Sequence, residues 1–380
     1  MSWHEIEFQK FITLQRGFDL PISQMKDGDI PVLGSNCIVG YHNVAKVQPP
    51  GVVTGRSGTL GVVQFTDKVF WPHNTSLWVK DFKGNDPKFV YYKLQTLKLE
   101  RFNGGASVPT LNRNVLDTLT IRIPNFSTQE KVASVLSMYD DLIENNRRRI
   151  QLLEESARLL YKEWFVHLRF PGHEHVKIIN GIPEGWKRGN VGELVSINSG
   201  YAFKSSNWID EGNPVIKIRN IIGNNDVDIE NCQCINDNVA EKAAHFALNQ
   251  NDLLIAMTGA TIGKIGIMPR TKKTYYLNQR VGFFHDKKFQ SLPFLFCIFN
   301  MEITQSQIIN LSAGAAQPNI SGNQIESIEI LLPTNRILQF FNETLEPIFN
   351  QRLNLIEQKT KLTQARDLLL PRLMNGEIAV

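Results

Sequence analysis

The chain has 380 residues, of which 42% are hydrophobic and 21% are charged, and its formal net charge is +4. This composition allows two domains of ordinary size and argues against a disordered chain. The sequence contains no apolar stretch of about 18 residues. Its first residues lack a basic segment followed by an apolar one. We therefore expect a cytoplasmic protein with no membrane contact, whose four cysteines are reduced thiols.

The first segment, residues 1–125, is predicted to be a mixed α/β domain. Gly51–Gly55 is typical of a short buried strand that leads into a glycine turn at Gly58–Gly61. A loop with glycine and proline follows at Gly105–Leu111, and Leu119–Pro124 is typical of a strand that ends at proline. The segment contains 14 Lys and Arg against 10 Asp and Glu, a net charge of +4.

A long helix is predicted for the next segment, residues 126–171. Ser127 and Glu130 have the spacing of a capping box, no Pro or Gly interrupts the helix, and Pro171-Gly172 ends it. Two rows of residues recur every seven positions, as in a coiled-coil seam, with Asn146 as the polar member that fixes register. The rows contain Val132, Leu136, Tyr139, Ile143, Asn146, Ile150, Leu153, Ala157, Leu160 and Trp164.

The second segment, residues 172–333, is predicted to repeat the first. Ala260–Gly263 matches Gly58–Gly61 at an offset of 202, and Gly314–Ile320 matches Gly105–Leu111 at an offset of 209. The shared order of turn, loop, strand end and helix indicates an internal repeat. The strands that correspond to those of the first segment are Asp252–Ala256 and Ile328–Pro333.

Positive charge in the second segment is local. From Leu253 to His285 there is no acidic residue, but there are five basic ones, Lys264, Arg270, Lys272, Lys273 and Arg280. Such a patch suits a polyanion, although an ordinary solvated face has the same composition.

A second long helix is predicted for residues 334–380. Pro333-Thr334-Asn335 can cap it, Asn375-Gly376 can stop it, and Pro347 is expected to kink or restart it. Its apolar row contains Phe341, Ile348, Leu355, Leu362 and Leu369. The fold class is therefore α+β. Two globular mixed α/β domains are separated by two long helices that form an antiparallel coiled coil, in an internal repeat with pseudo-two-fold symmetry.

Sequence signatures of catalysis are missing. Gly259–Lys264 is similar to a phosphate-binding loop but is one residue short and lacks the final Ser or Thr, so a structural turn is expected. Asp67, Asp81 and Lys83 could belong to a nuclease motif, but a loop after a strand explains them more simply. His173–His175 lacks a third metal ligand, and no metal site is predicted.

The chain resembles the specificity (S) subunits of type I restriction-modification enzymes over essentially its whole length. The segments that carry the resemblance are Gln129–Ala133, Asn145–Ile150, Leu160–Phe165, Arg169–Gly172, Pro183–Trp186 and Arg366–Ile378. In the first domain, only Trp3 remains of the opening found at Pro183–Trp186. The resemblance implies two target-recognition domains, residues 1–125 and 172–333, and two helical spacer regions, residues 126–171 and 334–380.

The resemblance also implies a non-catalytic, sequence-specific DNA-binding subunit of a host-defence complex. Each recognition domain would read one half of a bipartite, asymmetric site in double-stranded DNA. The helices would set the gap between the halves and dock two modification (methyltransferase) subunits. S-adenosylmethionine, ATP and Mg are expected on the modification and restriction (motor-nuclease) subunits, and no cofactor is expected on this chain.

Polar residues in or beside the repeated loops are the expected DNA contacts, because such side chains reach base edges and phosphates. In the first domain they are Arg16, Arg56, Ser57, Asn74, Asn112 and Arg113. In the second domain they are Lys204, Arg219, Lys264, Lys272, Lys273, Arg280, Gln317 and Asn319.

Two other functions stay open. One is a metal-dependent nuclease with a site around Asp67, Asp81 and Lys83, which cleavage of DNA by the purified chain would support. The other is a coiled-coil scaffold without DNA readout, which a lack of DNA binding in the presence of the methyltransferase would support. The target sequence and the gap do not follow from the sequence, because readout depends on side-chain geometry.

Overall fold

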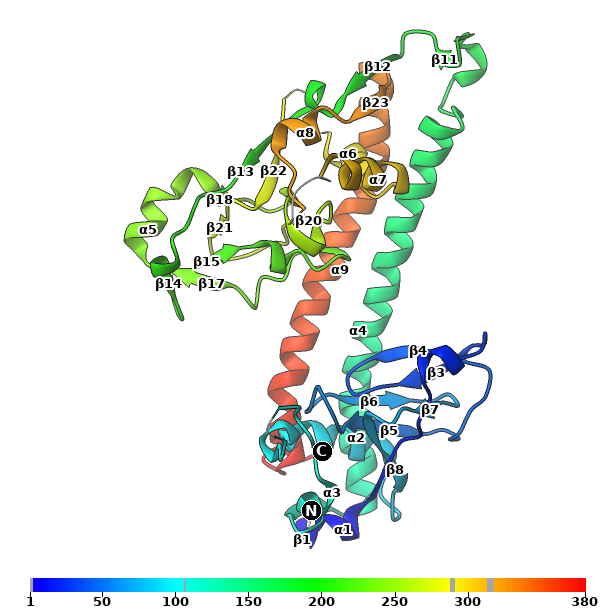
Figure 1. Cartoon of the computed structure of the whole chain (residues 1–380), viewed down its shortest axis with the longest axis vertical. Helices are drawn as coiled ribbons and strands as arrows, with labels where there is room; N and C mark the ends of the chain where they lie inside the picture. Colours follow the sequence, from blue (N-terminus) through cyan, green and yellow to red (C-terminus); the bar gives the residue numbers. More distant parts are fainter. Residues whose placement is uncertain (1–2, 106, 288–290, 313–317) are drawn as a thin grey trace. The chain divides into compact units, whose positions relative to one another are not determined.

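The computed structural model describes residues 3–105, 107–287, 291–312 and 318–380, and it divides the chain into two compact units (Figure 1). Unit 1 contains residues 1–144 and 360–380, and unit 2 contains residues 145–359. Two long helices, α4 (Phe126–Tyr161) and α9 (Asn335–Met374), each contribute one part to each unit. A unit is therefore a globular mixed α/β domain together with the helix parts that pack on it.

Unit 1 contains a four-stranded sheet in the order β2-β8-β5-β6 and a three-stranded sheet in the order β4-β3-β7. Neighbouring strands are antiparallel except for β3 and β7, which are parallel. Strands β1 and β9 pair separately, and α2 packs on β5 and β6. The bounds are β1 Trp3–Glu7, α1 Phe8–Phe11, β2 Thr13–Arg16, β3 Ile30–Leu33, β4 Ile38–His42, β5 Gly51–Gly55, β6 Val63–Thr66, β7 Trp71–Pro72, β8 Ser76–Asp81, α2 Pro87–Thr96, α3 Arg113–Asp117 and β9 Thr120–Pro124.

Unit 2 contains two five-stranded sheets, in the orders β13-β22-β19-β20-β16 and β14-β17-β15-β21-β18. The β12–β23 and β10–β11 pairs lie outside them. The bounds are β10 Ile178–Ile179, β11 Ile182–Pro183, β12 Lys187–Asn190, β13 Val195–Ser199, β14 Trp208–Ile209, β15 Asn213–Ile216, β16 Asn225–Asp226, β17 Gln233–Ile235, α5 Asp237–Lys242, β18 Ala247–Leu248, β19 Leu253–Ala256, β20 Ile265–Ile267, β21 Tyr275–Leu277, β22 Val281–Asp286, α6 Leu292–Phe299, α7 Glu302–Leu311, α8 Gly322–Glu326 and β23 Glu329–Leu332.

The strand order confirms the internal repeat. The order β13-β22-β19-β20 in unit 2 repeats β2-β8-β5-β6 in unit 1, and β17-β15-β21 repeats β4-β3-β7. The parallel pair β3–β7 has its counterpart in the parallel pair β15–β21. Unit 2 adds the edge strands β14, β16 and β18 to this common plan.

The helix ends differ from the sequence prediction in two places. Asn125, not Ser127, caps α4, because the Asn125 side chain accepts a hydrogen bond from the Thr128 amide at 3.0 Å. The α-helix ends at Tyr161, and a π-helical turn, Lys162–Val166, follows it. The capping box predicted at Ser127 and Glu130 is wrong, because Asn125 caps the helix instead. An Asn directly after a strand is as good a cap as Ser and comes first along the chain.

The second helix does not restart at Pro347. Helix α9 is continuous through this residue, and Phe341, Leu345 and Phe349 around it are buried. Apolar packing therefore maintains the helix despite the missing proline N–H. The predicted ends are confirmed. Thr334 accepts from the Ile337 amide at 3.4 Å, and Gly376 takes a left-handed φ of +76° after the last turn.

The helix parts are antiparallel within unit 2, because the partner number on α9 falls as the number on α4 rises. Asn146 donates to Gln358 at 3.5 Å, and Glu154 pairs with Arg352. None of the predicted seam residues on either helix is exposed. In unit 1, Leu136 on α4 belongs to the same apolar core as Leu373 on α9.

Aromatic rings form the core where the second domain meets the helices. The Phe165 ring lies 4.9 Å from that of Phe294 on α6 and 4.8 Å from that of Phe341 on α9. The four cysteines form no disulfide. No helix in the described part of the chain is long and apolar enough to cross a membrane.

Candidate nucleic-acid interface

In unit 1, the turn after β5 is hydrogen-bonded to the loop before α3. The Gly58 amide donates to the Pro109 carbonyl at 3.0 Å, and the Leu111 amide donates to the Arg56 carbonyl at 2.8 Å. These main-chain bonds hold two loops together that are about 50 residues apart in sequence, at one end of the sheet.

Unit 2 has the same loop pair. The Gly259 amide donates to the Pro318 carbonyl at 3.0 Å, and the Ile320 amide donates to the Met257 carbonyl at 3.0 Å. Gly61 in unit 1 and Gly263 in unit 2, which the sequence repeat aligns, have φ values of +87° and +81°. The glycine turn and the described end of the Gly…Pro loop, Pro318–Ile320 in unit 2, are therefore bonded to each other in the same way in each domain. Residues 314–317 of the predicted loop lie outside the described residues.

The loop after the first strand of the four-strand order approaches the end of β7 in unit 1 and the end of β21 in unit 2. A Cβ atom on Gly17, after β2, would lie 2.1 Å from the His73 carbonyl oxygen. A Cβ atom on Gly200, after β13, would lie 2.2 Å from the Leu277 carbonyl oxygen. Only glycine fits such a close main-chain approach.

The loops of unit 1 enclose a hollow of about 660 Å³. It is lined by Gln15, Arg16, Gly17, Phe18, Arg56, Leu77, Thr110, Leu111, Asn112, Arg113 and Asn114. Four of the predicted DNA contacts, Arg16, Arg56, Asn112 and Arg113, thus meet at one place. The two others lie beside it. Arg56 donates to the Asn74 carbonyl at 3.5 Å, and Ser57 donates its amide to the Thr75 carbonyl at 3.0 Å.

The side chains around this hollow have defined partners. Arg16 pairs with Asp19 at 3.0 Å, and the Asn74 amide group also donates to Asp19. Asn112 uses its side-chain oxygen to cap α3 through the Asn114 amide at 3.0 Å. Arg113 donates to the Leu14 carbonyl at 3.4 Å. These bonds orient polar groups at a solvent-facing surface, as binding to DNA requires.

Three basic side chains of the second domain, Lys217, Arg219 and Arg280, lie close enough for their charges to interact. The pKa of Lys217 is lowered by burial and by the charges of Arg219 and Arg280. Lys217 donates to Gln233 at 2.7 Å and lies 4.3 Å from the centre of the Trp208 ring. Arg219 and Arg280 are predicted DNA contacts, whereas Lys217 is not. The pattern Lys217-Ile218-Arg219, with two basic residues directly after a strand, could have indicated Lys217 as well.

The remaining predicted contacts of the second domain are more scattered. Lys204 is exposed before a 3-10 turn, and Lys264 is exposed in the β19–β20 hairpin beside Gly223. Asn319 is exposed and forms a β-bridge with Thr258, within the loop pair. Gln317 lies outside the described residues.

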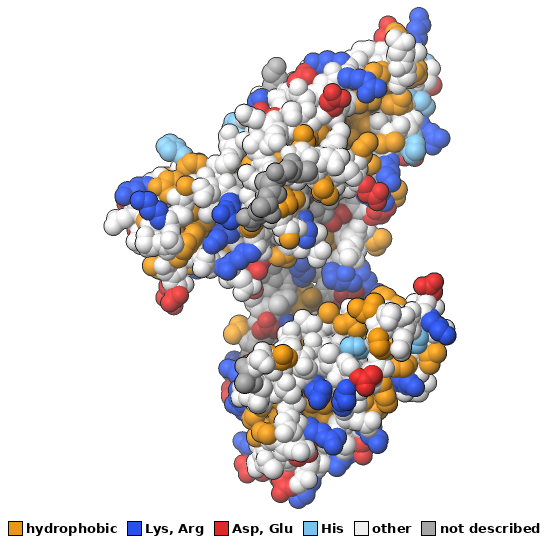
Figure 2. Space-filling model, viewed as in Figure 1, with side chains coloured by type: hydrophobic (Ala, Val, Ile, Leu, Met, Phe, Trp, Pro, Cys, Tyr) orange, Lys and Arg blue, Asp and Glu red, His pale blue; other side chains and the backbone are white. Residues whose placement is uncertain are grey.

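Lys272 and Lys273 are separated from Arg280 by the short strand β21. They precede β21, and Arg280 follows it, so the two groups are at opposite ends of this strand. Arg270, just before them, contacts Asn354 on α9 at 3.2 Å. Figure 2 shows basic side chains in separate groups on this face of each unit, so charge alone does not outline the interface.

Two residues of the nuclease alternative, Asp81 and Lys83, form hydrogen bonds within unit 1. Asp81 accepts the Lys83 amide at 2.8 Å, and the Lys83 ammonium donates to the Gln9 carbonyl at 2.6 Å. Asp67 is exposed in the turn after β6. The described residues contain no group of three or more His, Cys, Asp or Glu that could hold a metal ion. Gly259–Lys264 is a turn between antiparallel strands, as expected.

The chain matches the model of the type I restriction modification DNA specificity domain over residues 16–155 and 183–364. It is 26% identical over 305 residues to the type I restriction enzyme MjaIX specificity subunit of Methanocaldococcus jannaschii, covering 77% of this chain and 69% of the relative. It is 25% identical over 361 residues to the HindI specificity subunit of Haemophilus influenzae, covering 77% of each chain.

The fold is similar to a crystal structure of the S subunit of a type I restriction-modification system from M. genitalium. The TM-score is 0.61 at 17% identity, and the match covers 98% of this chain and 96% of that chain. A solved relative of similar length therefore shares this fold.

Proposed function

The chain belongs to the type I restriction modification DNA specificity family, and from this premise we propose that each of its two mixed domains reads one half of a bipartite, asymmetric DNA site. Specificity subunits in general are non-catalytic proteins that recognise DNA. The chain then selects the target, and the chemistry occurs on its partners.

The shared loop pair is the observation that carries this proposal. Main-chain bonds join the two loops in the same way in each domain, which supports equivalent roles for the side chains there. Contact with base edges is the role that we propose for them. The equivalent residues differ in chemistry. Arg56 corresponds to Met257, which is buried in the core of unit 2, and Thr110 corresponds to the exposed Asn319. Two like frames with unlike side chains suit two different half-sites, and hence an asymmetric target.

The helices are proposed to set the gap and to dock two modification subunits. Apolar side chains are exposed on α4 and the turn after it, away from the seam, at Met138, Leu142, Leu152, Leu159 and Val166. Several of them are separated by multiples of seven residues and so share one face. Exposed apolar stripes on a charged helix are typical of protein interfaces.

The modification subunits are proposed to supply S-adenosylmethionine and the restriction subunits ATP and Mg, in a cytoplasmic complex. No cofactor is proposed on this chain. If the chain were instead a nuclease, the purified protein would cleave DNA with a divalent metal and would need no partner.

Mapping of methylated adenines in strains with and without this chain tests the proposal. We expect one bipartite motif that disappears with the chain and returns with it. Leu152→Asp should prevent methylation by blocking docking, while the exposed control Arg169→Asp should leave it intact. Methylation that is independent of the chain, or a motif without two halves, would contradict the proposal.

A further inference from the structure

A buried arginine joins the second domain to both helices within unit 2. Arg352 on α9 is 2% exposed. Its Nε donates to Glu154 Oε1 on α4 at 2.6 Å. Its Nη2 donates to the Asn225 carbonyl and to Asp226 Oδ1 on β16, both at 2.9 Å. One guanidinium group therefore connects α4, α9 and β16, the edge strand of the sheet β13-β22-β19-β20-β16.

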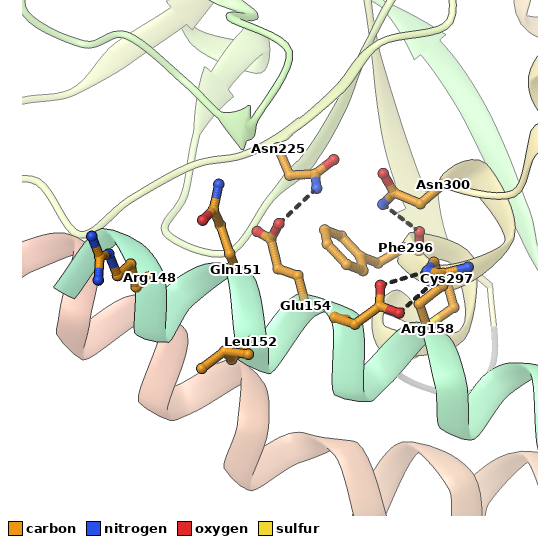
Figure 3. A pocket seen from close by; sticks show the side chains of 10 residues that line it. Arg148, Gln151, Leu152, Glu154, Arg158, Asn225, Phe296, Cys297 and Asn300 are labelled. Atoms are coloured by element: carbon orange, nitrogen blue, oxygen red, sulfur yellow. Dashed lines mark hydrogen bonds and ion pairs between the residues drawn. The ribbon is translucent and has the colours of Figure 1, made fainter. Parts of the chain in front are cut away.

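Two further contacts extend this network, in which Arg352 Nη1 is buried without a hydrogen-bond partner. Figure 3 shows Glu154 extending from α4 toward Asn225, whose amide group donates to Glu154 Oε2 at 3.1 Å. Lys359, one heptad after Arg352, pairs with Asp226 Oδ2 at 3.2 Å. Both oxygens of each carboxylate are thus engaged. A hollow of about 600 Å³, lined in part by Glu154 and Asn225, lies beside the network.

The strand that presents these acceptors is absent from the common plan of the two domains. The four-stranded sheet of unit 1 ends at β6, whereas the equivalent sheet of unit 2 continues from β20 to β16. Asn225 pairs in parallel with Gly266, and Asp226 with Ile267. Asn225 has a φ of +56°, a conformation that asparagine tolerates better than most residues. The added strand holds its acceptors rigidly because it is bonded into the sheet.

The network contributes geometry more than stability. Burying charges costs about as much as their attraction returns, so apolar side chains could hold the same interface equally well. An apolar contact, however, allows the packed elements to slide or rotate slightly. A planar guanidinium with three fixed acceptors does not, because its donors have fixed directions.

We propose that Arg352 is a positioning residue for DNA specificity, which fixes how the second domain is held on the helices and thereby the gap between half-sites that the chain accepts. This inference rests on the proposed function. Base pairs are stacked at about 3.4 Å, so a displacement of the domain by roughly that distance changes the accepted gap by one base pair.

The test is a methylation map of complexes that contain defined variants of the chain. Arg352→Met with Glu154→Gln removes the connection without leaving Glu154 as an unpaired buried charge. We expect the same two half-sites, and a rise of about tenfold in methylation at gaps one base pair shorter or longer, relative to the preferred gap. Loss of folding alone would lower all methylation without this change in ratio.

Arg270→Met is the matched control. Arg270 also joins the second domain to α9, through Asn354 at 3.2 Å and Glu357 at 3.7 Å, but this pair is solvent-exposed. The control should keep the gap ratio of the native chain. Arg352→Lys, which keeps the charge but removes the planar fork of donors, should give an intermediate ratio.

Two failures are distinguishable. If the native complex shows no bipartite motif, the proposed function is wrong. If the native complex shows one gap and the double variant keeps that gap alone, the positioning role of Arg352 is refuted and the proposed function stands. Should the double variant not assemble, Arg352→Lys alone gives the readout, since it keeps the charge but removes the planar fork of donors. A ratio unchanged from the native chain in that variant also refutes the role.

Discussion

Lys93 on α2 donates a hydrogen bond from its ammonium group to the carbonyl of Met374, the last residue of α9, at 3.1 Å. Lys93 is only 5% exposed. Burial, and secondarily the charge of Arg122, lowers its pKa from 10.5 to about 8. A cation at a helix C-terminus is favourable, but here it is largely withdrawn from water.

This burial makes the stability of unit 1 depend on pH. Between pH 8 and 10.5 the unfolded chain keeps the Lys93 proton while the folded chain releases it, so the unfolded state binds more protons and stability rises with pH. Lys93 alone should add about 1.5 kcal/mol to the free energy of unfolding from about pH 8 to about pH 9.5, read as the difference between the native chain and Lys93→Met. Denaturant unfolding at these two pH values, followed in the full chain, measures the change.

Lys93→Met is the control for this effect, because it removes the titrating group and retains a similar volume. Its free energy of unfolding should lack the rise. Measurements stay below about pH 10, the ordinary pKa of tyrosine, which limits tyrosine ionisation, and the remainder is common to the native chain and the variant. An equal rise in Lys93→Met would show that another group is responsible.

Arg16 and Arg56 should contact phosphates of the first half-site, because both line the hollow between the loops of unit 1. Replacing either with Ala should weaken DNA binding by the complex. The slope of log affinity against log salt should fall by roughly one unit for each phosphate that the variant no longer neutralises. Salt titrations of binding to a mapped target check this.

Lys10→Ala is the matched control on the same domain. Lys10 is exposed and precedes β2, whereas the loop at Gly17 follows this strand, so Lys10 lies at the other end. Its replacement should change neither affinity nor salt slope. If Lys10→Ala and Arg56→Ala behave alike, the assignment of the hollow is wrong.

Arg280 should matter more than Lys272 and Lys273 in the second domain. Arg280 shares its position with Lys217 and Arg219 at one end of β21, and the two lysines lie before the other end. Arg280→Ala should weaken binding by about tenfold or more, on the order of 1.4 kcal/mol. Lys272→Ala with Lys273→Ala should have a smaller effect. The reverse order would place the interface at the other end of the strand.

The gap should lengthen only when both helices are lengthened together. Glu144 and Asn145 on α4 lie at the division between the units, as do Lys359 and Thr360 on α9. A heptad inserted at both positions keeps the pairs Asp140–Arg366 and Glu154–Arg352 intact. It adds about 10.5 Å of helix, which corresponds to about three base pairs. Methylation mapping should show unchanged half-sites with a gap longer by that amount.

A heptad in α4 alone is the control for this experiment. It shifts one helix past the other, so the ion pairs on the two sides of the insertion cannot both form. This variant should not support methylation. A longer gap from the single insertion would show that the helix pairing does not set the spacing.

Local sequence signals predict the elements but not their long-range partners. The strand predicted at Gly51–Gly55 has the bounds of β5, because a buried run between glycines has few alternatives. The sequence favours Ser127 over Asn125 as the cap of α4 only weakly, since both residues can accept the same type of bond. Pro347 predicts an interruption of α9, but the buried rings around it are packed by residues distant in sequence.

The candidate site shows the same limit. The sequence brings Arg16 and Arg56 to the repeated loops, and the structure places both in one hollow. The sequence does not indicate that Arg352 is buried and paired, because its acidic partners are 198 and 126 positions away. A lone arginine in a charged helix has the pattern of a solvated surface residue, and only tertiary structure shows that it is buried.

The loop pairs are held by main-chain atoms, and this has a consequence for how such a protein can evolve. The bonds from Gly58 to Pro109 and from Gly259 to Pro318 need no particular side chain at Thr110 or Asn319. Substitutions there would alter the surface that we propose faces DNA, while the scaffold keeps its bonds. A lineage can therefore sample new target sequences by single substitutions in one half of the molecule, with the inherited reading of the other half unaffected.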